Sequence, residues 1–236
     1  MRLLERAKSP ESMATTEQDL PHQSSAEPQK IKVTRAPDRT RRRILEAARE
    51  EFCERGLQGA RVDSIAERAD INKRMLYHYF GNKNDLYCEV LLQAYAEIRS
   101  NERRLKLESA NPSEGMAELV RFTFRHFMSH PWFVRLLITE NMNGASNLRK
   151  VATIKDLHSP LVSQITDLLR RGTENGEFHD NIDAIELYIT IAALGFFYLS
   201  NNHTLSQIFG EDLSKRSRVK RREDHIVEVV LAYVRV

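Results

Sequence analysis

Hydrophobic and polar residues follow one another along most of the chain with the spacing of amphipathic α-helices. The pattern predicts helices over residues 38–55, 62–69, 73–80, 82–107, 113–130, 131–143, 147–171, 183–201 and 223–234, with a short helix within 203–213. We expect Pro160 to kink or break its helix, and the basic run 215–222 to form a loop. Because no strand-like alternation or internal repeat is present, the sequence predicts an all-α fold.

The stretch from Val62 to Phe80 predicts two short helices joined by a tight turn. The first has a single apolar stripe, and Asn72 is suited to cap the second because its side-chain oxygen can accept from free backbone N–H groups. In the second helix, one face is apolar and the other is polar: Leu76, Tyr79 and Phe80 lie opposite Arg74, Tyr77 and His78. A helix of this kind suits the major groove of DNA, although a solvated surface helix would show the same pattern.

The run from Thr40 to Leu92 resembles the DNA-binding domain of the TetR family of bacterial transcription repressors. The resemblance is carried, in this order and spacing, by ILEAAREEF (Ile44–Phe52), Gly56, DSIAERA (Asp63–Ala69), LYHYF (Leu76–Phe80), Lys83 and Leu86. Arg61, Asp70 and Asn72 depart from the commonest pattern, which has Ser or Thr, Gly and Ser there. Asp tolerates a left-handed turn and Asn caps as well as Ser, so the changes leave the fold intact and the bases read undetermined.

The resemblance implies a helix-turn-helix domain that binds double-stranded operator DNA. The residues expected to meet DNA are Arg61, Asn72, Lys73, Arg74, Tyr77, His78 and Lys83. Arg74 is suited to bidentate recognition of guanine, whereas the resemblance assigns Tyr77, His78 and Lys83 to phosphates. Because the N-terminal residues have little apolar surface to bury, we expect a disordered tail over 1–37 with a basic end. The resemblance implies a DNA-binding domain over 38–82 and an effector-binding and dimerisation domain over 83–236.

The second domain contains a helix that is apolar nearly all round, from Leu187 to Leu199, which must be covered on every side. The resemblance implies a homodimer in which the last two long helices of each subunit form the interface. Polar or amphipathic residues among apolar neighbours are the expected effector-binding set: His126, Trp132, Glu140, Asn141, Phe197, Tyr198 and Asn201. Each could equally be an ordinary core residue with a satisfied polar group.

Two further features bear on the ligand. Phe196, Phe197, Tyr198 and the downstream SQIFG are similar to TetR-family members linked to the catabolism of aromatic or heterocyclic acids, which implies a small aromatic or carboxylated effector. His126 and His130 have the i, i+4 spacing of metal ligands, but no third ligand is evident nearby, so we predict no metal and no cofactor.

Charge and composition narrow the class of protein. The net charge is only +3, yet residues 30–83 hold 14 Lys or Arg against 8 Asp or Glu, which indicates a localised site for a polyanion. The basic run 30–43 is either a solvated segment or an arm that follows phosphates. Two cysteines, no apolar signal segment in residues 1–38 and no apolar run of membrane-spanning length favour a cytoplasmic protein.

Together these features predict a transcriptional regulator, most simply a repressor that a small molecule releases from a pseudo-palindromic operator. Two alternatives remain open at this level: an architectural DNA-binding protein without an effector, and an activator. An enzyme is not expected, because the sequence has no nucleophile–base pair, phosphate-binding glycine loop or metal signature.

Overall fold

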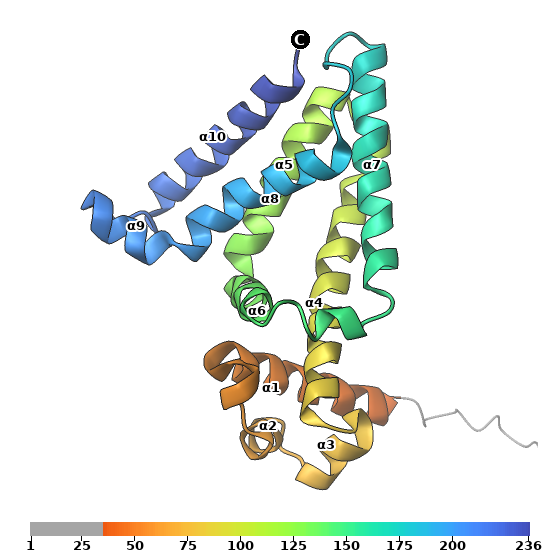
Figure 1. Cartoon of the computed structure of the whole chain (residues 1–236), viewed down its shortest axis with the longest axis vertical. Helices are drawn as coiled ribbons and strands as arrows, with labels where there is room; N and C mark the ends of the chain where they lie inside the picture. Colours follow the sequence, from red (N-terminus) through yellow and green to blue (C-terminus); the bar gives the residue numbers. More distant parts are fainter. Residues whose placement is uncertain (1–34) are drawn as a thin grey trace, which may run out of the picture. The chain divides into compact units, whose positions relative to one another are not determined.

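The computed structural model describes residues 35–236, so the predicted tail lies almost wholly outside the described part. Ten α-helices follow one another, with three short 3-10 turns at Arg103–Leu105, Leu107–Ser109 and Leu148–Lys150 (Figure 1). They are α1 (Arg35–Gly59), α2 (Val62–Arg68), α3 (Lys73–Phe80), α4 (Lys83–Glu102), α5 (Pro112–Ser129), α6 (Pro131–Met142), α7 (Ile154–Glu174), α8 (Ala184–Ser200), α9 (Asn202–Phe209) and α10 (Arg216–Val234). The all-α prediction is confirmed, since the described residues contain only one isolated β-bridge, between Phe178 and Arg235.

Helices α1 to α3 form a small three-helix group whose turns are set by single residues. Gly56 adopts φ 64°, ψ 174° and interrupts α1, so the predicted stop at this glycine is a sharp break close to the end of the helix. The turn between α2 and α3 places Asp70 at φ 49°, which confirms that Asp takes the left-handed conformation where glycine is commoner. Asn72 then caps α3 as expected.

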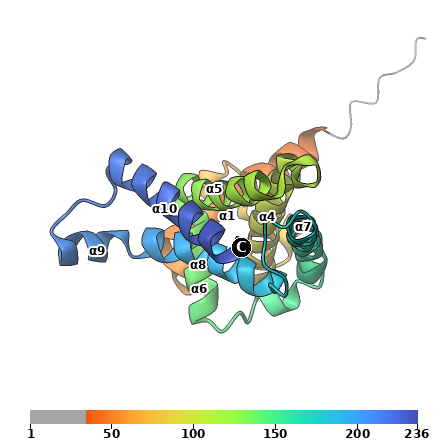
Figure 2. The ribbon, with the colours of Figure 1, turned by 90° about the horizontal axis from the view of Figure 1, so that it is seen from above.

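The remaining helices pack around α5, which contacts α7, α8 and α10 extensively. Figure 2 shows α10 lying across α5 and α8, with α9 projecting beyond them. Asn111 and Asp183 cap α5 and α8 by accepting from the backbone N–H groups two and three residues on. The inner stripe of α5 supplies the large side chains of this core, including Met116, Leu119 and Phe124.

Three helix boundaries differ from the prediction by five residues or more. α4 ends at Glu102, five residues early, because Lys106 takes a left-handed conformation (φ 49°) between two 3-10 turns. α7 starts only at Ile154 and continues through Pro160, so the predicted break does not occur. The predicted loop over 215–222 is wrong, because α10 begins at Arg216.

Ion pairs explain why this basic run is helical. Lys220 lies 2.7 Å from Asp224 and 3.3 Å from Glu223 along the same helix, and Arg218 pairs with Glu211. Arg222 donates to the Leu194 carbonyl oxygen at 2.9 Å. Carboxylates and a carbonyl oxygen thus compensate three cations whose mutual repulsion suggested a loop.

The expected domain boundary at residues 82 and 83 is not a break in the hydrophobic core. One cluster of buried residues includes Phe52 of α1, Leu76 of α3, Leu91 of α4 and Phe133 of α6. A second cluster lies among α5, α7, α8 and α10. No single described helix is long and apolar enough to cross a membrane. Taken together, α8 and α9 have the length and apolar composition of a membrane-spanning segment, but they are bent by 67° where they meet.

Candidate DNA-binding surface and effector site

The orientation of α3 follows from its cap and its two buried residues. Asn72 Oδ1 accepts from the backbone N–H of Arg74 at 2.8 Å. Leu76 is fully buried, and Phe80 is nearly so, with the Arg41 guanidinium over its ring. Because these residues face the core of the three-helix group, the opposite side of α3 must face solvent.

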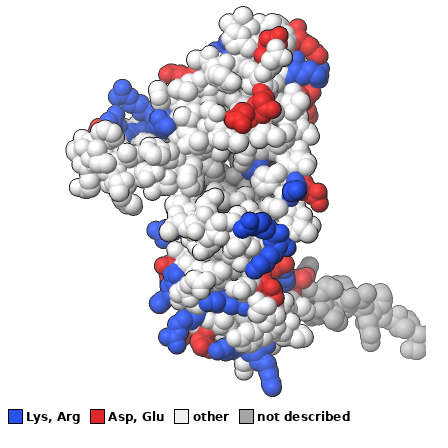
Figure 3. All heavy atoms as spheres, viewed as in Figure 1, with Lys and Arg blue, Asp and Glu red and all other residues white. Residues whose placement is uncertain are grey.

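The solvent-facing side of α3 carries the side chains expected to meet DNA. Arg74, Tyr77 and His78 are all exposed, and Tyr77 retains 43% of its accessible surface. Met75, which the sequence analysis left out, is exposed to a similar extent (41%) beside them. Met75 was omitted from the expected DNA contacts because it is apolar, although a helical wheel places it next to the exposed face of α3. Figure 3 shows Lys and Arg side chains gathered over the end of the molecule that α1 to α3 form.

The two other expected contacts near α3 are already engaged within the protein. Lys73 Nζ lies 2.8 Å from Asp63 Oδ1 on α2, and this hydrogen bond lowers the pKa of the Asp63 carboxyl. Lys83 Nζ donates to the carbonyl oxygens of Ala60 at 3.1 Å and Gln58 at 3.4 Å. Lys83 therefore satisfies the end of α1, and any phosphate contact would use a donor that these carbonyls leave over.

Charged side chains also fix α2 against α1. The carboxylate of Glu51, which is fully buried, accepts from the backbone N–H of Arg61 at 3.1 Å. Arg43 donates to the carbonyl oxygens of Ala69 and Asp70 at the other end of α2. Each end of α2 is thus held by a side chain of opposite sign to the helix dipole there, which sets the position of the turn and α3. Sequence reasoning missed both Glu51 and Arg43.

The seven expected effector residues have different surroundings. The Arg49 guanidinium lies over the Trp132 ring, with Cζ 4.5 Å from the ring centre. Glu140 is buried but accepts from Asn147 and from the backbone N–H of Leu148. Asn141 and Phe197 are exposed, Tyr198 donates to the Leu213 carbonyl oxygen, and Asn201 bonds within its own helix end. Only His126 is buried with an unpartnered ring nitrogen, Nε2.

Two buried charged residues, Arg99 and Glu102, meet the half-buried Tyr188 in a cluster that the sequence analysis did not identify. Arg99 and Glu102, on α4, are 2% and 1% exposed, and Arg99 Nη1 lies 3.0 Å from Glu102 Oε2. Arg99 Nη2 donates to the Tyr188 hydroxyl of α8 at 2.9 Å. Burial and the nearby charges of His130 and Arg99 lower the pKa of His126 to about 4. The contacts of the cluster therefore join α4 and α8.

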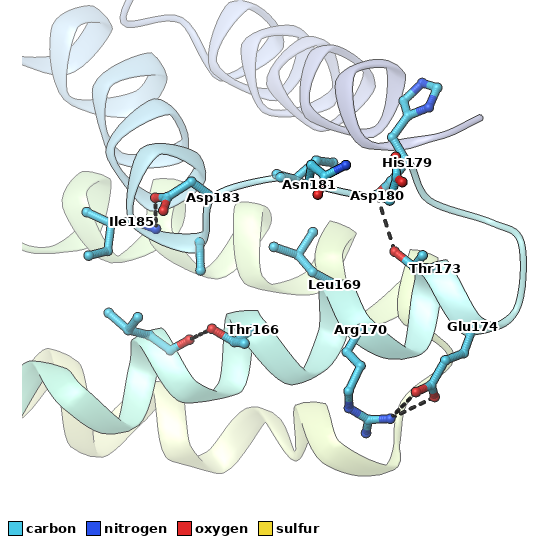
Figure 4. A pocket seen from close by; sticks show the side chains of 13 residues that line it. Thr166, Leu169, Arg170, Thr173, Glu174, His179, Asp180, Asn181, Asp183 and Ile185 are labelled. Atoms are coloured by element: carbon cyan, nitrogen blue, oxygen red, sulfur yellow. Dashed lines mark hydrogen bonds and ion pairs between the residues drawn. The ribbon is translucent and has the colours of Figure 1, made fainter.

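An open pocket elsewhere in the second domain differs from this buried cluster. A pocket of about 530 Å³ lies between α7 and the segment that leads into α8 (Figure 4). Its polar groups pair with one another: Arg170 with Glu174, and the Thr173 hydroxyl with the His179 carbonyl oxygen. Because these polar groups pair with one another and the pocket is open to solvent, it has fewer features of a specific small-molecule site than the buried cluster.

Metal binding has little support in the described part of the chain. Within residues 35–236, no group of three His, Cys, Asp or Glu side chains could hold a metal ion. His126 and His130 stack with ring centres 4.2 Å apart, and His130 Nε2 lies 3.3 Å from Glu97. Cys53 and Cys88 are free and half-buried, and desolvation raises the pKa of Cys53 to about 11, which keeps its thiol protonated.

Known protein families match both the helix-turn-helix region and the C-terminal helices of this chain. Residues 44–90 match the family described as bacterial regulatory proteins, tetR family, and residues 112–230 match the tetracyclin repressor-like C-terminal domain. The transcriptional repressor NicS of Pseudomonas putida is 37% identical over 179 residues, which cover 76% of this chain and 84% of NicS. The repressor SCO4008 of Streptomyces coelicolor is 32% identical, over 68% and 78% of the two chains.

Solved structures show the same fold. The ketosteroid transcriptional regulator KstR2 of Mycobacterium tuberculosis superposes with a TM-score of 0.62 at 24% identity, over 83% of this chain and 95% of that one. At this identity the similarity concerns the fold alone. The sequence matches and the helix-turn-helix geometry together show that the chain belongs to the TetR family of bacterial transcriptional regulators, which bind operator DNA through the N-terminal domain and an effector through the C-terminal domain.

Proposed function

We propose that this regulator binds a pseudo-palindromic operator as a homodimer, with one α3 helix in each of two major grooves, and that a small molecule releases it. The observation that carries the DNA contact is the two-sided character of α3. Leu76 and Phe80 anchor it inward, so Arg74, Tyr77 and His78 project together from the opposite face. Arg74 is the side chain suited to a guanine edge, and the flanking groups are suited to phosphates.

Exposed apolar stripes on α8 and α10 support the homodimer. Along α8, Ile185, Ile189 and Phe197 are 54%, 51% and 58% exposed at spacings of four and eight residues. On α10, Val229 and Tyr233 are exposed one turn apart. Stripes of this kind on two adjacent helices are suited to a four-helix interface with a second copy, whose symmetry would present two α3 helices to one duplex.

A continuous set of contacts supports communication between the interior and α1. His126 stacks on His130, which immediately precedes α6, and Trp132 follows at the start of α6. The Trp132 ring lies under Arg49 of α1, and its carbonyl oxygen accepts from the Cys53 thiol at 3.4 Å. An effector that shifts α5 or α6 would therefore shift α1, and with it the spacing of the two recognition helices. It acts only through its different affinity for the two arrangements.

The test is binding of the full chain to a duplex taken from the intergenic DNA upstream of its own gene, measured by fluorescence anisotropy. We expect saturable binding that falls steeply with salt and exceeds binding to a scrambled duplex of equal length. Arg74→Ala should weaken specific binding by roughly 1–3 kcal/mol, whereas Arg104→Ala, an exposed arginine far along the chain from α3, should not. Equal binding to both duplexes would refute a sequence-specific regulator.

The homodimer is tested separately by sedimentation velocity. Ile189→Glu places a charge on the exposed α8 stripe and should shift the dimer toward monomer, whereas Glu186→Gln, at an exposed position on the same helix, should leave it dimeric. A monomeric parent chain at micromolar concentration, or an unchanged Ile189→Glu variant, would contradict this interface.

A further inference from the structure

We infer that the interior cluster around Arg99 is the binding site for the effector, and that the effector is a small aromatic carboxylic acid whose carboxylate pairs with the Arg99 guanidinium. This rests on the proposed function, because it identifies the ligand class of the same regulator. It assigns ligand contact to residues outside the set expected from the sequence, with His126 the only member in common.

The first support is the state of the Arg99 side chain. It is 2% exposed, and its Nε and Nη1 groups donate no hydrogen bond, while Nη2 donates to the Tyr188 hydroxyl. A buried guanidinium with free N–H groups is costly, because desolvation is only offset when these donors are used. Nε and one Nη form the edge of the guanidinium that matches the two oxygens of a carboxylate.

The second support is that Glu102 does not compensate Arg99 fully. Its Oε2 lies 3.0 Å from Arg99 Nη1, yet both Glu102 oxygens lack a hydrogen bond of acceptable geometry. Burial raises the pKa of Glu102 to about 7, so near neutral pH this carboxyl is protonated in a large fraction of molecules. Arg99 then has no anionic partner at hydrogen-bonding distance, and a ligand carboxylate can replace Glu102.

Aromatic side chains around the cation define the second part of the ligand. The Tyr188 ring lies under the Arg99 guanidinium, 5.4 Å from ring centre to Cζ. Tyr95 packs edge-on against His158 and Phe133, at 5.2 and 5.6 Å between ring centres. Tyr95 lies one helical turn before Arg99 on α4, and the positive charge of Arg99 contributes to lowering the pKa values of His126 and His158. Rings with polar edges beside a guanidinium suit a flat aromatic ring that carries a carboxylate.

The space beside this cluster implies that binding moves helices. The cavity bounded by Arg99, Glu102, Leu157, Pro160 and Leu161 is narrower than a water molecule. A ligand can enter only if α4 and α7 separate slightly, and α4 leads directly into the DNA-binding end of the chain. Ligand binding would therefore be coupled to movement of α4 and α7, and such coupling is what an effector needs in order to change DNA binding.

The test uses benzoate and phenylacetate as probes, with benzamide and phenylacetamide as neutral controls of the same shape. The full-length protein without DNA is studied at neutral pH by differential scanning fluorimetry and isothermal titration calorimetry. We expect millimolar or tighter binding of at least one acid, with a raised melting temperature, and no effect of the amides. If neither acid binds, or if an amide binds as well as its acid, the inference is overturned.

Three variants separate a ligand contact from a structural role. Arg99→Gln should weaken acid binding by roughly tenfold to a hundredfold, and Arg99→Lys, which keeps the charge but loses the planar edge, by roughly tenfold. Glu102→Gln removes the competing carboxylate and should strengthen acid binding. It keeps the inference testable if the Arg99 variants fail to fold. Unchanged or weaker acid binding by Glu102→Gln would overturn the inference.

The matched control is Arg222→Gln. Arg222 also lies over a tyrosine ring, that of Tyr198, at 5.5 Å, and it also donates to one oxygen, so its loss reproduces the packing change in another part of the fold. Acid binding should survive this substitution; an equal loss for Arg222→Gln would overturn the assignment to Arg99. Because no DNA is present, a negative result leaves the operator experiment intact, and failure of the operator experiment leaves this binding measurable.

Discussion

The buried carboxylate of Glu51 offers the sharpest test of how the recognition helix is held in place. Its side chain is 1% exposed and lies between α1 and the start of α2. One oxygen accepts from the Arg61 backbone N–H at 3.1 Å and lies 3.4 Å from Arg55 Nε, and the other lies 3.5 Å from Arg68 Nη2. Glu51→Ala therefore removes the N-terminal anchor of α2 and leaves the Arg61 backbone N–H, Arg55 and Arg68 without this acceptor.

The magnitude follows from this burial. Arg55 and Arg68 are partly solvated, so Glu51→Ala leaves no unpaired charge buried, and the loss is that of hydrogen bonds to a charged acceptor, about 1.5–3 kcal/mol; we take the upper end, about 3 kcal/mol, because one carboxylate serves three donors. For a chain of this size each kcal/mol shifts the melting temperature by roughly 2–4 °C, so the expected loss is roughly 6–12 °C. Glu54 pairs with the same Arg68 at 2.5 Å but is exposed, so Glu54→Ala should change the melting temperature little.

The assay is urea and thermal unfolding followed by circular dichroism, combined with operator binding below the melting transition. Glu51→Ala should also weaken operator binding in its folded population, because α2 contacts α3 and helps to hold it in position. Equal melting temperatures for the Glu51→Ala and Glu54→Ala variants would refute the reasoning that burial decides the energy of these pairs.

The remaining predictions concern packing and pH. Gly172→Ala should destabilise by roughly 2–3 kcal/mol, because a Cβ there would lie 2.0 Å from the ring of buried Phe178; Gly59→Ala, with its nearest neighbour at 3.4 Å, should not, and equal urea midpoints would contradict this. Burial raises the pKa of Glu102 from 4.5 to about 7, so between these values the folded chain holds a proton that the unfolded chain releases, and stability falls as pH rises. Relative to the parent, Glu102→Gln should therefore gain stability across this window. Burial lowers the pKa of His126 from 6.5 to about 4, so His126→Gln should lose stability relative to the parent as pH rises from about 4 to 6.5. The two pH predictions are tested by urea unfolding at several pH values, and a free energy of unfolding that changes with pH in each variant as it does in the parent would refute them.

The sequence by itself determined most of the helical framework and the DNA-binding end. Apolar spacing located α2, α3, α5, α6 and α8 to within a few residues, because an amphipathic helix needs only a local pattern. Asn72 was identifiable as a cap because its hydrogen bond reaches only two residues along the chain. The outward face of α3 followed from the same local geometry.

Tertiary structure alone decided where the buried charges are and which groups they meet. Arg99 donates to Tyr188, 89 residues away along the chain, and Arg43 reaches the end of α2 across 26 residues. Such pairs depend on how helices pack, and a helical wheel cannot distinguish an arginine on a solvated face from one inserted between helices. The expected effector residues have different surroundings for this reason, and the helical start of α10 was missed because Glu211 and Leu194 lie outside that helix. The local apolar pattern determines where helices form. Which groups the buried charges contact depends on the cost of removing those charges from water, and that cost arises only when the chain folds.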